Sequence, residues 1–271
     1  MCRTFLTCEK GGSMALMLVI SPAKRMDVVE GPPFAQTRPA FLADAQHLAR
    51  KLRSLGYDGA RSVWRCSDAL ARPNWKRLAT MPEDMAREPR LLSPAVLAYV
   101  GIQYQHLAPQ VMTEKELMWL SSHLRIISGM YGVLRPFDGV VPYRLEMQAR
   151  LYVAGRRDLY EFWGRRLLEA MVVDGADVIV NVASQEYAKA VAPWAQRMGA
   201  PVVTCVFGEV RASDGRVVQR ATEAKAARGA FVRWCAERGV EKAEQLEGFS
   251  ERGYRLDRSR CDAETLTFAR G

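Results

Sequence analysis

Polar side chains that could do chemistry gather where apolar runs of the sequence end. The segment Ser21-Pro22-Ala23-Lys24 follows the apolar run 16–20 and has the S-x-x-K spacing of acyl-transfer enzymes. In those enzymes the lysine lies one helical turn beyond the serine and takes its proton. No lysine-threonine-glycine segment follows later in this chain. A strand-to-loop turn with a surface lysine therefore stays open as the alternative.

A second polar group follows the apolar run 177–182. Ser184 and Glu186 come directly after this run, at the expected start of a helix. Open α/β sheets bind ligands beyond the carboxyl ends of their strands, and helix N–H groups attract anions. Ser184 is also a candidate N-cap. Glu146, in the segment 142–147, is another carboxylate, and either glutamate is a candidate general acid or base if it is buried near a substrate.

Two glycines three residues apart mark a third candidate site. Gly129 and Gly132 stand between apolar residues, and Arg135 follows. Glycines let backbone N–H groups approach a phosphate because they lack a blocking side chain. The pattern is loosely similar to the glycine hairpin of helix-hairpin-helix DNA binders, whose glycines are usually two apart. An ordinary tight turn is the alternative.

Positive charge is the main compositional signal. The chain has 39 Lys and Arg against 30 Asp and Glu, a net charge of +9, which favours polyanionic partners such as nucleic acids. Between residues 211 and 238 there are seven basic and three acidic residues. Within this stretch Lys225 and Arg228 share one helix face and could hold neighbouring phosphates. A solvated helix face remains the alternative.

Cysteine and histidine usage indicates neither a metal site nor a disulfide framework. The six cysteines include no C-x-x-C pair, and the three histidines are isolated. We therefore expect no metal or other cofactor, and a reduced, cytoplasmic protein. No apolar stretch approaches the roughly 20 residues of a membrane span, so no membrane association is expected. Residues 1–16 are expected to form a loose N-terminal extension, and 17–271 a single domain.

Helices and strands alternate along the chain, which predicts one compact α/β to α+β domain with a central mixed sheet and surrounding helices. Segment 125–146 should contain short strands and tight turns because glycine and proline recur in it. The predicted strands are 16–20, 177–182, 202–207, 216–219 and 266–268. The predicted helices are 38–55, 58–66, 67–79, 113–123, 158–172, 185–198 and 222–238.

Taken together, these segments resemble the YaaA family of bacterial peroxide-stress proteins. The resemblance spans nearly the whole chain from about Met17. Two departures from the family pattern are Gln185, where an acidic residue is common, and Ala226, where a second lysine is common. The matching blocks are 18–24 with Asp27, 128–136 with Asp138, 142–147, 158–160 with 162–164, 181–184 with 186–187, 224–225 with 227–229, and 248–249 with 253–254.

The resemblance implies a mixed α/β domain with a positively charged cleft and a helix-hairpin-helix-like element. It also implies binding of double-stranded DNA, and protection from oxidative damage through lower free intracellular iron. The phosphate-contacting role would fall on Gly129, Tyr131, Gly132 and Arg135. The cleft would be lined by Lys24, Arg144, Lys225 and Arg228.

Two hypotheses about function follow. In the first, the protein binds DNA without catalysis and holds phosphates through backbone amides and basic side chains. In the second, it is an enzyme that acts on a nucleotide or nucleobase, with Ser21, Lys24, Glu146 and Glu186 as the catalytic candidates. Direct iron binding by carboxylates is a third, weaker possibility. The hypotheses differ in whether Glu146 and Glu186 share a closed pocket with Lys24 and Arg228.

Overall fold

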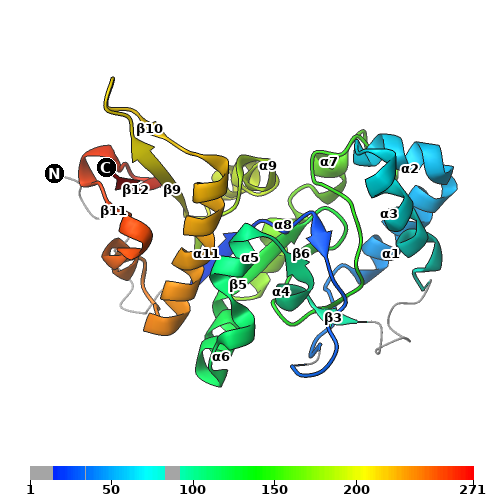
Figure 1. Cartoon of the computed structure of the whole chain (residues 1–271), viewed down its shortest axis with the longest axis horizontal. Coiled ribbons are helices and arrows are strands. Elements are labelled where there is room, and N and C mark those ends of the chain that lie inside the picture. Colours follow the sequence, from blue (N-terminus) through cyan, green and yellow to red (C-terminus); the bar gives the residue numbers. More distant parts are fainter. Residues whose placement is uncertain (1–14, 34, 83–91) are drawn as a thin grey trace.

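The computed structural model describes residues 15–33, 35–82 and 92–271. Within these residues an eight-stranded mixed sheet forms the centre, in the order β11-β12-β9-β8-β1-β5-β6, with β10 paired to β9 (Figure 1). This confirms the predicted mixed α/β domain. Its strands are β1 (Leu16–Ile20), β5 (Leu124–Ser128), β6 (Gly132–Leu134), β8 (Val178–Asn181), β9 (Val202–Val210), β10 (Val217–Val218), β11 (Arg255–Leu256) and β12 (Thr265–Arg270). Two short pairs accompany it, β2 (Arg25–Met26) with β4 (Tyr99–Val100), and β3 (Ser93–Pro94) with β7 (Gly139–Val140).

Strand β1 lies inside the sheet, between β8 and β5, and every one of its five residues is buried. It is parallel to β5 on one side and to β8 on the other, with Leu18 opposite both Leu124 and Val180. A strand covered on both faces needs a continuous apolar sequence, which this run supplies. The chain therefore leaves β1 toward one side of the sheet and later returns to its other side. Such a switch point opens a crevice at the carboxyl ends of the two strands.

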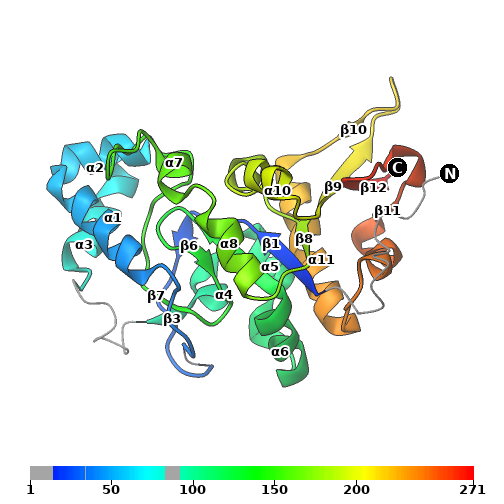
Figure 2. The ribbon, with the colours of Figure 1, turned by 180° about the vertical axis from the view of Figure 1, so that it is seen from behind.

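Helices cover both faces of the sheet. Helices α5, α6 and α11 lie on the face seen in Figure 1, and α8 and α10 lie on the opposite face, seen in Figure 2. Helices α1, α2 and α3 form a separate unit at the β6 end of the molecule (Figure 1). The helices are α1 (Leu42–Ser54), α2 (Gly56–Trp64), α3 (Asp68–Thr80), α4 (Ala95–Ala98), α5 (Ile102–Leu107), α6 (Glu114–His123), α7 (Leu159–Trp163), α8 (Arg166–Val173), α9 (Gln185–Ala188), α10 (Ala192–Met198) and α11 (Ala221–Arg238).

Two predicted helices are each interrupted in the structure. The predicted helix 158–172 is divided into α7 and α8 at Gly164, whose φ of +52° lies outside helical geometry. The predicted helix 185–198 is divided into α9 and α10, and Pro193 stands in the first turn of α10. Proline lacks the N–H that would continue the helix from before it, so it begins a helix more readily than it extends one.

The predicted helix 113–123 is confirmed, with the capping box that begins it. The Thr113 hydroxyl accepts from the Glu116 N–H at 3.4 Å, and the Glu116 carboxylate accepts from the Thr113 N–H at 2.7 Å. Each side chain thus satisfies one N–H group that the first turn of α6 leaves without a partner.

The glycine hairpin joins two strands, so the helix-hairpin-helix-like element is not confirmed at this segment. Gly129 follows β5, and Gly132, with φ +72°, begins β6. A Cβ atom on Gly129 would lie 2.5 Å from the carbonyl oxygen of Leu145. A Cβ atom on Gly132 would lie 2.9 Å from the rings of Phe41 and Trp163. These glycines therefore allow close packing inside the domain.

Helix α11 packs closely against α5, and one glycine makes this possible. A Cβ atom on Gly229 would lie 2.0 Å from the carbonyl oxygen of Gln103. No other residue type could occupy this position without moving one of the two helices. The close packing brings the first half of α11 beside the start of α5, at the edge of the crevice.

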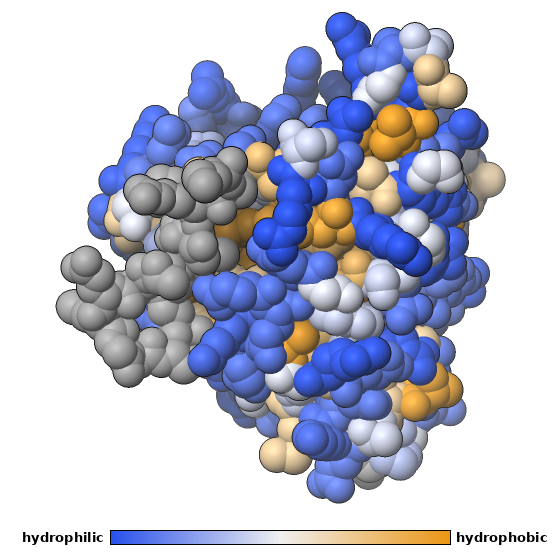
Figure 3. Space-filling view, turned by 90° about the vertical axis from the view of Figure 1, so that its left-hand side faces the viewer, coloured by the Kyte–Doolittle hydropathy of each residue, from blue (hydrophilic) through white to orange (hydrophobic). Residues whose placement is uncertain are grey.

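The surface at the β10–β12 end of the molecule is polar. The end of the molecule that carries β10, β11 and β12 is mostly hydrophilic, with apolar residues in small separate groups (Figure 3). Among the described residues, no helix is long and apolar enough to cross a membrane. Leu16 is already part of β1, so the strand begins one residue before the predicted domain boundary. Residues 1–14 of the predicted N-terminal extension lie outside the described part.

Candidate functional site

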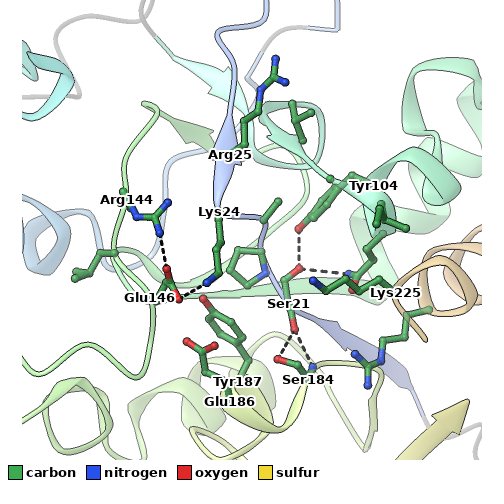
Figure 4. A pocket seen from close by; sticks show the side chains of 18 of the residues that line it. Ser21, Lys24, Arg25, Tyr104, Arg144, Glu146, Ser184, Glu186, Tyr187 and Lys225 are labelled. Carbon is green, nitrogen blue, oxygen red and sulfur yellow. Dashed lines mark hydrogen bonds and ion pairs between the residues drawn. The ribbon is translucent and has the colours of Figure 1, made fainter. Parts of the chain in front are cut away.

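A pocket of about 390 Å³ opens beyond the carboxyl ends of β1 and β8. Its walls come from five segments that are distant in sequence, 21–25, 100–104, 143–146, 184–187 and 225–228 (Figure 4). This volume lies in the range of small-molecule sites, which is about 300–1,000 Å³. The site thus occupies the place where open α/β sheets bind their ligands.

Ser21 joins β1, β8 and α5 at the base of the pocket. Its hydroxyl accepts from the Ser184 N–H at 2.8 Å and donates to the Ser184 hydroxyl at 3.2 Å. Its carbonyl oxygen accepts from the Tyr104 hydroxyl at 3.0 Å and from the Gln103 amide at 3.3 Å. Ser184 makes no side-chain cap on α9, because its hydroxyl is engaged with Ser21. Ser21 is therefore part of the framework that holds the pocket together.

Lys24 is directed toward Glu146 rather than toward Ser21 (Figure 4). Residues 21–23 are not helical, so the lysine does not lie one helical turn above the serine. Its Nζ atom lies 2.9 Å from Glu146 Oε2, and Arg144 lies 3.0 Å from Glu146 Oε1. The Glu146 side chain is only 16% exposed, whereas that of Lys24 is 66% exposed. Glu146 is thus a carboxylate held between two cations.

Glu186 has different surroundings from Glu146, although both line the pocket. Burial raises the pKa of Glu186, and the nearby Glu146 raises it further, while the Gln148 N–H and Lys24 oppose the rise. The Gln148 N–H donates to Glu186 Oε1 at 3.2 Å, and the Tyr160 hydroxyl donates to the Glu186 carbonyl oxygen at 2.9 Å. Burial in the pocket therefore favours the protonated form of Glu186.

Arg228 and Lys225 enter the pocket from α11. The Nε–H group of Arg228 is buried without a hydrogen-bond partner, and its Nη2 atom reaches Gln219 Oε1 at 3.3 Å. Burial lowers the pKa of Arg228. Within the described ranges, no carboxylate lies within ion-pair distance of its guanidinium. Lys225 is exposed and extends into the pocket (Figure 4).

Four predicted phosphate contacts do not line this pocket. Gly129, Tyr131 and Gly132 are buried, and the Met130 and Tyr131 N–H groups donate to the Ser128 hydroxyl. These hairpin residues lie outside the pocket, and their predicted phosphate-contacting role stays a prediction. What the sequence pattern reflects is the close approach of Gly129 to the 143–146 wall of the pocket.

Arg135 is the fourth predicted phosphate contact, and it lies at the end of the sheet opposite the pocket. It follows β6, whose Leu134 is opposite Ile126 in antiparallel β5. Its guanidinium pairs with Asp174, which also holds the buried Arg125 at 2.9 Å. Hence the structure brings together Ser21, Lys24, Arg144, Glu146, Glu186, Lys225 and Arg228, and it separates Arg135 from them.

Three polar residues of the pocket were not predicted from the sequence. Arg25, Gln103 and Tyr104 also line the cavity. Gln103 and Tyr104 belong to α5, a six-residue helix whose short apolar pattern gave no sign of a site. The close approach of Gly229 to Gln103 is the feature that places them, and it appears only in three dimensions.

A family model described as peroxide stress protein YaaA matches residues 16–260 of the chain. The UPF0246 protein of Pediococcus pentosaceus is 42% identical over 253 residues, which cover 93% of this chain and 97% of that protein. The UPF0246 protein of Lactiplantibacillus plantarum is also 42% identical, over 93% of this chain and 98% of that protein. The UPF0246 protein of Lachnoclostridium phytofermentans is 38% identical, over 94% of this chain and 97% of that protein. On this evidence of match length and identity, the chain belongs to the YaaA family of peroxide stress proteins.

Proposed function

We propose that this peroxide stress protein binds a phosphate-bearing ligand of nucleotide size in the pocket beyond β1 and β8. The ligand is a free nucleotide or one nucleotide unit of a nucleic acid. The proposal rests mainly on Arg228, a half-buried arginine whose Nε–H group is fully buried and which has no carboxylate partner in the described residues. An uncompensated buried charge is costly, and a bound anion would remove that cost.

The other groups of the pocket suit the rest of a nucleotide. Lys225 adds a second positive charge one helical turn from Arg228, which favours a doubly charged phosphate. The opposite wall carries Tyr187, Glu146 and Glu186, which offer an aromatic ring and hydrogen-bond acceptors for a base or sugar. A volume of about 390 Å³ admits such a unit but not a duplex.

The test measures binding of nucleoside 5′-monophosphates by isothermal titration calorimetry. Replacing Arg228 by methionine keeps most of the side-chain volume and removes the charge. Affinity should fall about 10- to 100-fold, as expected for a lost charge-assisted hydrogen bond to phosphate. The matched control is Arg135→Met, which removes an arginine at the other end of the sheet. Equal affinities in both variants, or no binding by the wild type, would overturn the proposal.

Binding of double-stranded DNA is the second part of the proposal, supported by charge outside the pocket. Residues 42–80, which form α1 to α3, contain eight Lys or Arg and three Asp. Arg65, Lys76 and Arg77 are exposed on this unit. Nucleic acids bind such surfaces by phosphate neutralisation. A triple alanine variant of these residues should bind a fluorescent duplex more weakly, with a shallower log-salt slope, while nucleotide binding is unchanged.

Protection from oxidative damage and a lower level of free intracellular iron belong to the same proposal. The described residues contain no group of three or more His, Cys, Asp or Glu side chains arranged to hold a metal ion. We therefore place the effect on iron downstream of nucleotide or nucleic-acid binding. A strain with the Arg228→Met protein should then show the iron level and peroxide sensitivity of a deletion strain. The predicted cytoplasmic location stays a prediction.

A further inference from the structure

Glu146 and Glu186 form a pair of carboxylates in one pocket with contrasting partners. Glu146 is held by Lys24 at 2.9 Å and by Arg144 at 3.0 Å, so its negative charge is stabilised in place. Glu186 accepts backbone hydrogen bonds from the 147–148 segment, and burial favours its neutral form. Two carboxyl groups in one pocket, one held between cations and the other buried away from them, are a usual arrangement for a charged partner and an acid in bond cleavage.

The backbone fixes the two groups relative to each other. The Glu186 carboxylate binds the N–H of Gln148, two residues beyond Glu146, so both glutamates are tied to the same short segment. The Tyr160 hydroxyl holds the Glu186 carbonyl oxygen from the far side. Gly129 allows this segment to pack against the β5–β6 hairpin without a gap. Glu186 is thus held by main-chain and tyrosine contacts and Glu146 by two cations, as a preorganised site requires.

The bond that such a pair could cleave depends on what else the pocket holds. In the proposed nucleotide complex, Arg228 and Lys225 bind the phosphate on the α11 side, and the glutamates lie on the opposite wall. The ligand's base and its link to the sugar would then lie near the two carboxyl groups. Cleavage of that link needs a proton on the leaving base and a negative charge near the sugar, which becomes positive in the transition state.

We propose that the pocket hydrolyses the bond between base and sugar of a bound nucleotide unit, with Glu186 as the general acid and Glu146 as the fixed negative charge. Glu186 donates its proton to the departing nitrogen, which keeps the electron pair of the broken C–N bond. Water forms the new C–O bond at the sugar and loses a proton, which replaces the one that Glu186 gave. The products are a free base and a sugar phosphate. This inference rests on the proposed function.

The experiment incubates the full-length protein with each nucleoside 5′-monophosphate, in ribose and deoxyribose forms, and with a short single-stranded DNA. Released base is measured by chromatography between pH 5 and 9. We expect base release from at least one substrate, with a rate that falls as rising pH ionises Glu186. Glu186→Gln should lower the rate at least 100-fold, in line with the usual contribution of a general acid. Glu244→Gln, at an exposed position outside the pocket, is the matched control.

The variants separate failure of this inference from failure of the proposed function. If nucleotides bind in an Arg228-dependent manner but no substrate releases base, the hydrolysis is wrong and the binding proposal stands. If base release is the same in Glu186→Gln as in wild type, Glu186 is not the acid and the inference is overturned. Loss of release in both Glu186→Gln and Glu146→Gln, with nucleotide affinity retained, would support it. Absence of binding would overturn both proposals.

Discussion

The two ends of the central sheet hold arginines in opposite ways. At the amino end of β5, Arg125 is only 4% exposed and pairs with Asp174, which also binds Arg135. At the carboxyl ends of β1 and β8, Arg228 is half-buried, and its buried Nε–H group has no carboxylate beside it in the described residues. Burial lowers the pKa of both Arg125 and Arg228, but only Arg125 has a carboxylate that opposes the shift.

This difference separates a structural arginine from one that serves a ligand. In a buried ion pair each charge has its partner within the chain, and removing one partner leaves the other charge buried and unpaired. An arginine whose buried N–H group lacks a carboxylate gains little for its desolvation within the chain, and an anion that arrives from outside would supply the missing charge. Both residues look alike in the sequence, where each is an arginine beside apolar residues.

The largest expected effect comes from removing the partner at the structural end. Asp174→Ala leaves Arg125 buried without a carboxylate, so the free energy of unfolding should fall by about 3–5 kcal/mol. Urea denaturation measures this change. The control is Asp44→Ala, which breaks a more exposed pair with Arg166 and should cost about 0–1 kcal/mol. Similar losses in the two variants would show that the Arg125 pair is no different from a surface pair.

A smaller effect should follow from disturbing the glycine that positions Arg228. Gly229→Ala places a Cβ atom 2.0 Å from the Gln103 carbonyl oxygen, so α11 and α5 must separate. Such overpacking costs about 1–3 kcal/mol, and nucleotide affinity should fall as Arg228 moves. In Gly248→Ala the new Cβ atom has ordinary contacts of 3.6 Å with Trp234 and should change neither property. Unchanged affinity in Gly229→Ala would mean that the helix contact does not position the arginine.

At the pocket end, removing the arginine should increase stability in the absence of ligand. Arg228→Met replaces a buried charge by an apolar side chain of similar length, so the free energy of unfolding should rise by about 1 kcal/mol. Thermal unfolding, with and without nucleotide, measures it. Nucleotide should raise the Tm of the wild type and not that of the variant. A variant that is less stable than wild type would indicate that Arg228 has a structural role.

The smallest effects concern pH, and they have opposite signs at the two ends. Burial raises the pKa of Asp174, but the hydrogen bonds and charges of Arg135 and Arg125 outweigh it, so the net pKa is lowered. Its contribution to stability is present above the pKa of an unfolded aspartate and is lost as pH falls through the folded value. The pKa of Glu186 is raised, so its contribution is present at low pH and is lost as pH rises through the folded value.

Stability measured from pH 3 to pH 8 should show this contrast. Relative to wild type, Glu186→Gln should become more stable as pH rises, and Asp174→Asn should lose its disadvantage as pH falls. A parallel pH dependence in the two variants would contradict the assignment of opposite shifts. Nucleotide affinity at neutral pH should be unaffected by Asp174→Asn, because Asp174 lies outside the pocket.

Local patterns predicted the elements well, because each depends on nearby residues. The apolar run of β1, the capping box of α6 and the long helix α11 all appear where the sequence places them. The prediction of two continuous helices, 158–172 and 185–198, was wrong. In each, a single residue, Gly164 or Pro193, outweighs the apolar periodicity. The mixed sheet was predicted as a class, but its strand order depends on contacts between residues more than a hundred positions apart.

The pocket was predicted only in part, because local patterns identify single residues but not their neighbours in the folded chain. Ser21 and Glu186 were recognised as polar residues just beyond predicted strands, and Arg228 as a basic residue on a helix face, and the structure brings them together. The role of the glycine hairpin could not be seen, because sequence does not show whether a glycine faces solvent or another backbone. For Gly129 the neighbouring backbone is at Leu145, which only the folded chain reveals.

The central place of β1 also has a consequence during synthesis of the protein. This strand is synthesised before its neighbours β5 and β8, which emerge more than a hundred and about a hundred and sixty residues later. Until then both edges of a wholly apolar strand are open, which is the condition under which nascent chains associate wrongly. We expect the emerging chain to bind a chaperone over residues 16–20, and ribosome profiling of chaperone-bound nascent chains would detect it. The ligand pocket, which needs α11, is completed only when a segment about two hundred residues beyond β1 has emerged.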